Sequence, residues 1–264
     1  MSSYAERLKN NEAIQTSTAS GPQFPGAMLS ANGQTGEFSY IGVGKDFKDA
    51  IEINSVAMIV DFAMTRIKYR QGSDVTVTSN YVVAGEKTPY AITLSGVTYV
   101  GNTKKELTGK IQLQPNESLS QETIYIGYPA TINGEAQKTA EPIWYVSRGV
   151  NAWRLNDTLN EAGGLTAATL LTITNNKEKF KNQNNGTNFV LTFAAQQIDE
   201  SRIDAMGSWI DASGAADTVE NYKAEMIAES NRIANPQFEQ TGISTNDLYG
   251  ASDAQQIDDD DLPF

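Results

Sequence analysis

The chain has 264 residues, with 20 Lys or Arg and 32 Asp or Glu, so its formal net charge is −12; it contains no cysteine and no histidine. These absences exclude a disulfide framework, a thiolate or imidazole zinc site, a cysteine nucleophile and a Ser-His-Asp relay. No apolar run approaches the roughly 18 residues of a membrane helix, and residues 1–30 lack the layout of a signal peptide. We therefore expect a cytoplasmic protein that makes no contact with a membrane.

The acidic residues are concentrated in the last quarter of the chain. Residues 1–200 have a charge balance of −2, from 17 basic and 19 acidic residues, whereas residues 201–264 have a balance of −10, from 3 and 13. Such asymmetry between segments is typical of an interaction tail or of a nucleic-acid-binding protein. The net charge of the whole chain therefore does not argue against nucleic-acid binding by its body.

The first segment, residues 1–37, is predicted to be a flexible N-terminal arm. It is rich in Ser, Asn, Gln, Gly and Thr, and two prolines interrupt any regular structure. Ser3 and Glu6 fit a capping box, which predicts a short helix near residues 4–14 within this arm.

Residues 38–200 are predicted to form a β-rich body. Its strand candidates are rich in Val, Ile, Thr, Tyr and Phe and are separated by Gly, Asn or Pro, which is the pattern of an antiparallel sandwich or barrel. A short helix is expected at Trp153–Ala162, where two glycines end it. The strand candidates are Val56–Tyr69, Val75–Val83, Tyr90–Val100, Leu107–Leu113, Thr123–Tyr128, Ile143–Ser147, Thr169–Thr174 and Asn188–Ala194.

The first long strand of this body carries an unusual pattern. Five apolar residues at even positions from 56 to 64 share one parity with Arg66, Lys68 and Arg70. Because it is costly to bury three cations beside five apolar side chains, we expect a β-bulge near residues 63–65 that swaps the two faces and bends the strand. A long, strongly bent first strand suits a small closed barrel.

The last 64 residues fall into three parts. Residues 201–235 are predicted to contain a short helix, because 217–233 carry a partial apolar stripe that stops before a proline. Residues 236–257 have the polar, weakly periodic composition of a linker. The final residues are Asp258, Asp259, Asp260, Asp261, Leu262, Pro263 and Phe264, and with the linker they are expected to form a disordered acidic tail.

The seven residues 258–264 have the chemistry of a docking peptide. Phe264 can fill an apolar pocket, its α-carboxylate can pair with an Arg or Lys, and Pro263 limits the conformational entropy lost on binding. The four aspartates would steer the tip toward a basic rim and make docking sensitive to salt. The alternative is a solvated acidic tail with no docking role.

This tip, Asp258 to Asp261 followed by Leu262, Pro263 and Phe264, resembles the acidic tip of bacterial and phage single-stranded-DNA-binding proteins. The resemblance implies an OB-fold-like antiparallel barrel with insertions, and recruitment of replication, recombination and repair proteins through the tip. It covers seven residues and the overall layout. The body is longer than the common bacterial form and the linker lacks dense Gly, Gln and Pro, so a phage-type or divergent member in the host cytoplasm is expected, with self-association left open.

A body that holds a single strand needs cations along the phosphates and aromatic faces on which bases stack. Three clusters supply both cations and aromatic side chains, and Lys104 and Lys105 add two further cations that could contact phosphates. The clusters are Arg66, Lys68, Tyr69 and Arg70; then Trp144, Tyr145, Arg148, Trp153 and Arg154; and then Lys177, Lys179, Phe180 and Lys181.

Each cluster also has a plainer interpretation. The cations of the first can form a solvated strand face with Tyr69 in the core. In the second, neighbouring residues of a strand point to opposite faces, so one of Trp144 and Tyr145 is expected to be buried and the other to lie on the surface. The third is expected to form a β-hairpin finger that closes over a strand, or else a flexible loop with Phe180 tucked against the body.

We predict a non-catalytic single-stranded-DNA-binding protein with no cofactor and no metal. The alternative is a β-rich structural or assembly protein, such as a virion component, that does not bind nucleic acid. A third class, a carboxylate-metal enzyme such as a nuclease, is supported only by Asp46, Asp49 and Glu52, which a solvated helix face explains more simply. The chain has no P-loop, dinucleotide fingerprint or EF-hand spacing.

Overall fold

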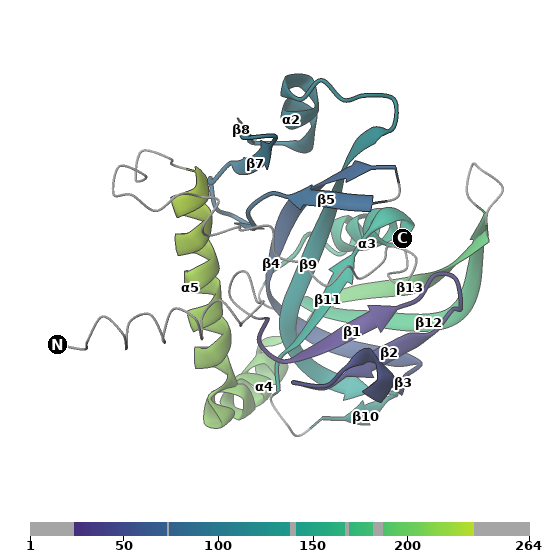
Figure 1. Ribbon diagram of the computed structural model, residues 1–264. Coiled ribbons are helices and arrows are strands. Elements are labelled where there is room, and N and C mark those ends of the chain that lie inside the picture. Colours follow the sequence, from purple (N-terminus) through teal and green to yellow (C-terminus); the bar gives the residue numbers. More distant parts are fainter. Residues whose placement is uncertain (1–23, 73, 138–140, 167–168, 182–186, 235–264) are drawn as a thin grey trace, which may run out of the picture.

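The computed structural model describes residues 24–72, 74–137, 141–166, 169–181 and 187–234, in which a large curved sheet is flanked by helices (Figure 1). The sheet has 11 strands in the order β13-β12-β4-β9-β11-β1-β2-β3, with β5 and β6 pairing with β4 and β10 with β9. These strands are β1 (Ala27–Ala31), β2 (Phe38–Ile41), β3 (Ile51–Glu52), β4 (Ser55–Gln71), β5 (Asp74–Thr78), β6 (Val82–Val83), β9 (Glu117–Ile132), β10 (Glu135–Ala136), β11 (Ile143–Ser147), β12 (Thr169–Lys181) and β13 (Thr187–Gln197).

The remaining elements pack against this sheet. β7 (Tyr90–Leu94) and β8 (Val97–Gly101) form a separate hairpin, and the 3-10 helix η1 is Phe47–Asp49. The helices are α2 (Lys104–Lys110), α3 (Gly149–Glu161), α4 (Glu200–Ser213) and α5 (Ala215–Ala234). The class is therefore mixed α/β rather than mainly β, and the expected single short C-terminal helix is a pair of helices.

The strand-rich body is confirmed, but the described strands form an open sheet and not the predicted closed barrel. Its path ends at β13 on one side and β3 on the other, and no ladder joins these edges. Instead β1 lies parallel to β11 and, with β2 and β3, extends the sheet beyond β11. The sheet is curved, and the turn between β1 and β2 approaches β13 across the open side. There the backbone N–H of Phe189 in β13 donates to the carbonyl of Gly33 at 2.6 Å.

The predicted β-bulge in β4 exists, but it lies earlier than expected. Val60 pairs with Gly127 and Phe62 with Ile126, which leaves the exposed Asp61 as the extra residue. A carboxylate suits this position because it stays in solvent, where it accepts a hydrogen bond from the Tyr128 hydroxyl at 2.9 Å. Because the bulge lies before Phe62, this residue is on the same face of β4 as Arg66, Lys68 and Arg70. A bulge at residues 63–65 would have placed it on the opposite face.

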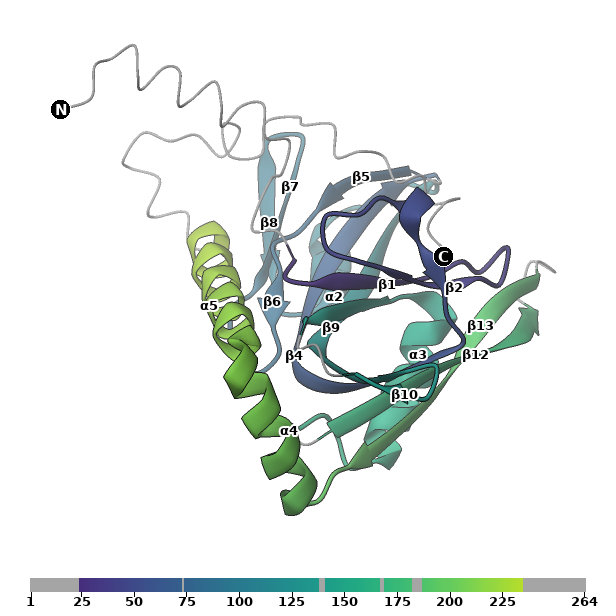
Figure 2. The same ribbon diagram turned by 90° about the horizontal axis from the view of Figure 1, so that it is seen from below.

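The buried apolar side chains of the described residues form three hydrophobic cores. Inside the curl, Val56, Met58 and Val60 pack with β11, β12 and β13, and helix α3 contributes Leu155 and Leu159. On the outer face, residues of β4, β9 and β11 pack against α4 and α5, which lie along one side of the sheet (Figures 1 and 2). A third, smaller core joins the β7–β8 hairpin and α2 to the far end of β4.

Several local predictions were wrong for physical reasons. Part of the predicted arm is ordered, since β1 lies within it and pairs with β11. The predicted strand Leu107–Leu113 is largely helix α2, because Thr103 caps it by accepting a hydrogen bond from the Glu106 N–H at 3.1 Å. The predicted helix at 217–233 is confirmed as α5.

The predicted helix near 4–14, the linker 236–257 and the tip 258–264 lie outside the described residues. Within the part of the chain that is described, no helix is both long enough and apolar enough to cross a membrane.

Candidate nucleic-acid interface

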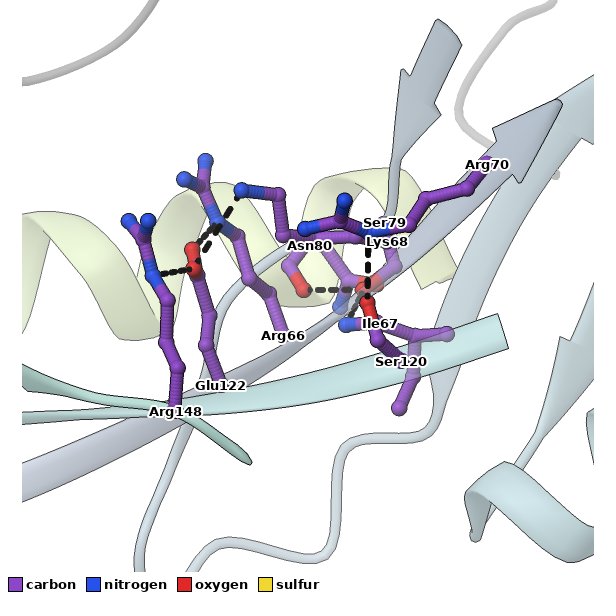
Figure 3. Close-up of polar contacts among 9 residues, drawn as sticks. All are labelled: Arg66, Ile67, Lys68, Arg70, Ser79, Asn80, Ser120, Glu122 and Arg148. Carbon is purple, nitrogen blue, oxygen red and sulfur yellow. Dashed lines mark hydrogen bonds and ion pairs between the residues drawn. The ribbon is translucent and has the colours of Figure 1, made fainter. Parts of the chain in front are cut away.

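Four cations gather on the outer face of the sheet, near the end of β4 that lies beyond the bulge (Figure 3). Arg66, Lys68 and Arg70 alternate along β4 and therefore point to the same side. Arg148, the residue that precedes α3, reaches the same place from the end of β11. The opposing strand β9 contributes Glu122, which pairs in register with Arg66.

Glu122 is the centre of this cluster, and its side chain is only 1% exposed. Its Oε1 pairs with the Nε of Arg66, while its Oε2 lies 2.8 Å from the Nε of Arg148 and 3.4 Å from the Nζ of Lys68. Arg70 lies at the edge of the group, where its Nε donates to the hydroxyl of Ser120 at 3.4 Å. One carboxylate therefore faces three cations, and positive charge is in excess.

The electrostatics of the cluster keep its carboxylate ionised. Burial by itself would raise the pKa of Glu122, but Arg66, Arg148 and Lys68 overcome this and lower that pKa to about 2. For Lys68, burial lowers the pKa of the ammonium to about 8; Glu122 opposes this shift, whereas the neighbouring arginines add to it. The site thus has more positive charge than its own acid neutralises, a property that favours binding of an anion.

A buried hydrogen-bond network supports this face from β4 to α5. The backbone N–H of Ile67 donates to the Ser79 hydroxyl at 2.9 Å, and that hydroxyl donates to the carbonyl of Asn80 at 2.8 Å. The amide nitrogen of Asn80 donates to the Ser230 hydroxyl on α5 at 2.6 Å. Because these groups are satisfied by one another, they fix the position of the next residue, Tyr81.

Aromatic side chains lie beside the cations. The guanidinium of Arg66 sits over the ring of Tyr81, 4.8 Å from its centroid. Phe24 stacks on Trp144 with ring centroids 4.3 Å apart, and it also contacts Tyr81 and Tyr222. The sequence did not single out either residue, because Phe24 lies in the predicted N-terminal arm and Tyr81 lies in the predicted strand Val75–Val83 with no cation beside it.

The two neighbouring aromatics of β11 point in opposite directions, as predicted. Tyr145 is 2% exposed and belongs to the inner core, whereas Trp144 lies on the outer face, under Phe24. Tyr69 also turns inward, because it packs against the third core. The structure therefore places Tyr69 and Tyr145 away from the cationic face, which is the plainer interpretation for both.

A second group of the predicted residues surrounds the hairpin of β12 and β13, which extends beyond the sheet (Figure 1). Lys179 lies 5.3 Å from the ring centroid of Phe189, and Lys177 pairs with Glu52 at 3.4 Å. Lys181 is exposed and Phe180 is partly buried. The predicted hairpin is confirmed, although residues 182–186 are outside the described part, and its closing over a DNA strand stays a prediction.

Helix α3 brings two more predicted residues toward the hairpin. Trp153 is 62% exposed, and Arg154 forms a bidentate pair with Glu178 of β12, with Nη1 and Nη2 donating at 2.9 and 2.7 Å. Lys104 and Lys105 are exposed on α2, apart from both groups. The structure thus brings together Arg66, Lys68, Arg70, Arg148 and the Trp144 face, and it leaves the hairpin group and α2 as separate regions.

Within the described ranges, no group of three or more Asp or Glu residues is arranged to hold a metal ion. No known protein family, curated protein sequence or solved structure matches this chain.

Proposed function

We propose that this protein binds single-stranded DNA without catalysing a reaction on it. The observation that carries the proposal is the excess of positive charge on the outer face of β4 and β9, where Arg66, Lys68 and Arg148 surround the single carboxylate of Glu122. Sequence-independent binding of a single strand depends on such phosphate contacts.

The strand connectivity supports an OB-like body with insertions. The long strand β4 pairs with both β9 and β12, β9 pairs with β11, helix α3 joins β11 to β12, and β12 pairs with β13. This order is similar to that of a five-stranded OB fold whose helix lies between its third and fourth strands. The difference is that β1, which precedes β4 in sequence, pairs with β11 at the edge where the fifth strand of a closed barrel would pair. OB folds bind oligonucleotides on the face of their second and third strands and on two flanking loops.

These parts have direct counterparts in this chain. On this assignment the face of the second and third strands is the outer face of β9 and β11. Helices α4 and α5 pack against it and Phe24 stacks on its Trp144, so we propose for DNA only the adjoining cationic cluster. One flanking loop corresponds to residues 72–116, which carry Lys104 and Lys105, and the other to the β12–β13 hairpin with Lys177, Lys179, Phe180 and Lys181. We assign phosphate contacts to the cationic face and base stacking to the exposed Trp153 and to Phe180.

The acidic residues 258–264 complete the proposal. Their sequence supports docking of replication, recombination and repair proteins, and their charge lets them compete with DNA for basic surfaces at low salt. Deletion of residues 258–264 is expected to preserve or strengthen DNA binding while abolishing capture of such a partner. The cytoplasmic location, in the host if the protein is phage-encoded, belongs to the same proposal.

The proposal is tested by titrating labelled oligo-dT with the full-length protein at low and at high salt. Binding is expected to be tighter to oligo-dT than to a duplex of equal length and to weaken steeply as salt rises. Equal or tighter binding to the duplex would rule the proposal out.

A different observation favours the second candidate, an assembly protein. Val43, Phe47 and Ile51 are 55%, 47% and 62% exposed around β3, which is an edge strand of the sheet. Exposed apolar residues at a strand edge favour pairing with another chain. Stable assembly in light-scattering measurements without DNA, lost on Ile51→Lys, together with no binding to oligo-dT, would favour this candidate.

A further inference from the structure

Arg66 and Arg148 approach Glu122 through the same nitrogen. In both residues the ion pair involves Nε, and neither terminal nitrogen, Nη1 or Nη2, is hydrogen-bonded to another described residue. Figure 3 shows that both guanidinium groups extend past the carboxylate in the same direction, with the ammonium of Lys68 next to them. Four terminal nitrogens therefore lie together on one side of Glu122.

Arg154 provides a comparison within the same protein, because both of its terminal nitrogens are hydrogen-bonded. Its two terminal nitrogens donate to the two carboxylate oxygens of Glu178, which is the bidentate geometry that arginine forms with carboxylates and phosphates. Glu122 instead accepts a hydrogen bond from the Nε of Arg66, and its Oε2 forms an ion pair with the Nε of Arg148 that lacks hydrogen-bond geometry. The outer edges of both groups retain the paired donors that match an oxyanion.

The surroundings of these donors would strengthen their interaction with an anion. The side chains of Arg66 and Arg148 are 23% and 14% exposed, so the donors lie at the margin of a partly dehydrated region, where charges interact more strongly than in water. The hydroxyl of Tyr222 on α5 is buried, has no hydrogen-bond partner among the described residues, and lies close enough to Arg66 to influence the pKa of that guanidinium.

We infer that Arg66, Lys68 and Arg148 form a binding site for one phosphate group, called the seat below. Glu122 is a positioning residue that keeps the two guanidinium groups oriented toward that phosphate. The three cations exceed Glu122 by two charges, so a singly charged phosphodiester fits the seat without leaving excess negative charge. Under the proposed function the ligand is one backbone phosphate of single-stranded DNA. Only this identification rests on the proposed function; the seat itself does not.

Inorganic pyrophosphate tests the seat without DNA. The full-length protein is titrated calorimetrically at low ionic strength, and its melting temperature is followed in parallel. We expect the wild type to bind, and Arg148→Ala to bind at least about tenfold more weakly, because it loses charged hydrogen bonds. Arg232→Ala is the matched control, since this arginine already pairs with Glu229 through Nε and Nη2 and should leave pyrophosphate binding unchanged.

A second variant covers the case in which Arg148→Ala does not fold. Arg148→Lys retains the positive charge but loses the planar pair of donors, and it is also expected to bind pyrophosphate more weakly. Absence of binding by the wild type, or binding that is unchanged in the Arg148 variants, would overturn the inference.

The pyrophosphate and oligo-dT experiments distinguish failure of the seat from failure of the proposed function. If pyrophosphate binding depends on Arg148 but oligo-dT does not bind, the seat stands and the proposed function is wrong. If oligo-dT binds, Arg148→Ala is expected to reduce the slope of log K against log salt by about 0.7, the value for one phosphate contact on a single strand. An unchanged slope would leave the proposed function standing and overturn the seat.

Discussion

The Oε2 atom of Glu122 lies 2.8 Å from the Nε atom of Arg148, and this ion pair joins β9 to the residue at the N-cap position of α3. The same carboxylate holds Arg66 and Lys68 from β4. One buried acid therefore ties three chain segments together and at the same time fixes the direction of the cations. A change at Glu122 is therefore expected to affect both the stability of the fold and the phosphate binding that we infer for these cations.

Substitution of Glu122→Gln is expected to destabilise the fold by about 3 kcal/mol, because it leaves three partly buried cations without their counter-ion. Urea denaturation followed by aromatic fluorescence measures the change. Glu106→Gln, which removes a solvent-accessible i,i+4 pair with Lys110, is the control and should cost less than about 1 kcal/mol. Equal effects of the two substitutions would show that the buried cluster contributes no special stability.

The stability of the protein is expected to fall in acid through Glu122. The pKa of this carboxyl is lowered from its ordinary value of 4.5 to about 2 in the folded protein, so the stabilising contribution is complete above pH 4.5 and is lost as the pH falls toward 2. Melting temperatures of the wild type and Glu122→Gln should therefore converge as the pH is lowered through this window. A constant difference between them would contradict the assignment.

Anion binding is expected to weaken above about pH 8 because of Lys68. The groups that face its ammonium are Glu122, Arg66, Arg70 and Arg148, and together with burial they give Lys68 a pKa of about 8. A bound phosphate favours the charged ammonium, so binding is accompanied by proton uptake near this pH. Lys68→Arg should remove this part of the pH dependence, measured by calorimetric titration with pyrophosphate between neutral pH and pH 9.

Substitution of Tyr222→Phe is expected to leave the free protein as stable as the wild type or slightly more stable. The Tyr222 hydroxyl is buried and makes no hydrogen bond to another described residue, so its removal takes away a desolvation cost. Thermal unfolding measures this effect. A loss of more than about 1 kcal/mol would indicate that the hydroxyl has a partner in the folded protein.

The close approach of β4 and β9 at the bulge requires a glycine. A Cβ atom at Gly127 would lie 1.8 Å from the carbonyl oxygen of Ile59, so Gly127→Ala is expected to force the strands apart and cost about 3 kcal/mol or more. Gly109→Ala is the matched control, because no atom lies within 4 Å of its Cβ position in α2 and alanine favours a helix. Urea denaturation should show opposite signs for the two substitutions.

Elements defined by strong local patterns were predictable from sequence. Strand β11 has the predicted bounds Ile143–Ser147, and its alternation correctly placed Trp144 and Tyr145 on opposite faces. Helices α3 and α5 lie near their expected positions, because an apolar stripe or a pair of terminal glycines marks them. In these segments the local pattern and the tertiary packing agree.

The centre of the candidate site was not predictable, because it depends on pairing between distant segments. Glu122 lies one residue before the predicted strand Thr123–Tyr128, in a polar stretch that becomes strand only because β4 pairs along its whole length. Its partner Arg66 is 56 residues away in sequence. The position of the bulge at Asp61 was also missed, and this position decides which face the cations share.

The most direct measurement is the salt dependence of oligo-dT binding by fluorescence anisotropy for two double variants with the same change of charge. Lys68→Ala with Arg148→Ala removes two cations from the proposed binding face, whereas Lys45→Ala with Lys48→Ala removes two exposed lysines beside β3. The first pair is expected to weaken binding and to reduce the slope of log K against log salt by about 0.7 for each lost phosphate contact, while the second leaves the slope near that of the wild type. Equal losses in the two double variants, or no loss in the first, would contradict binding of single-stranded DNA on the face formed by β4 and β9.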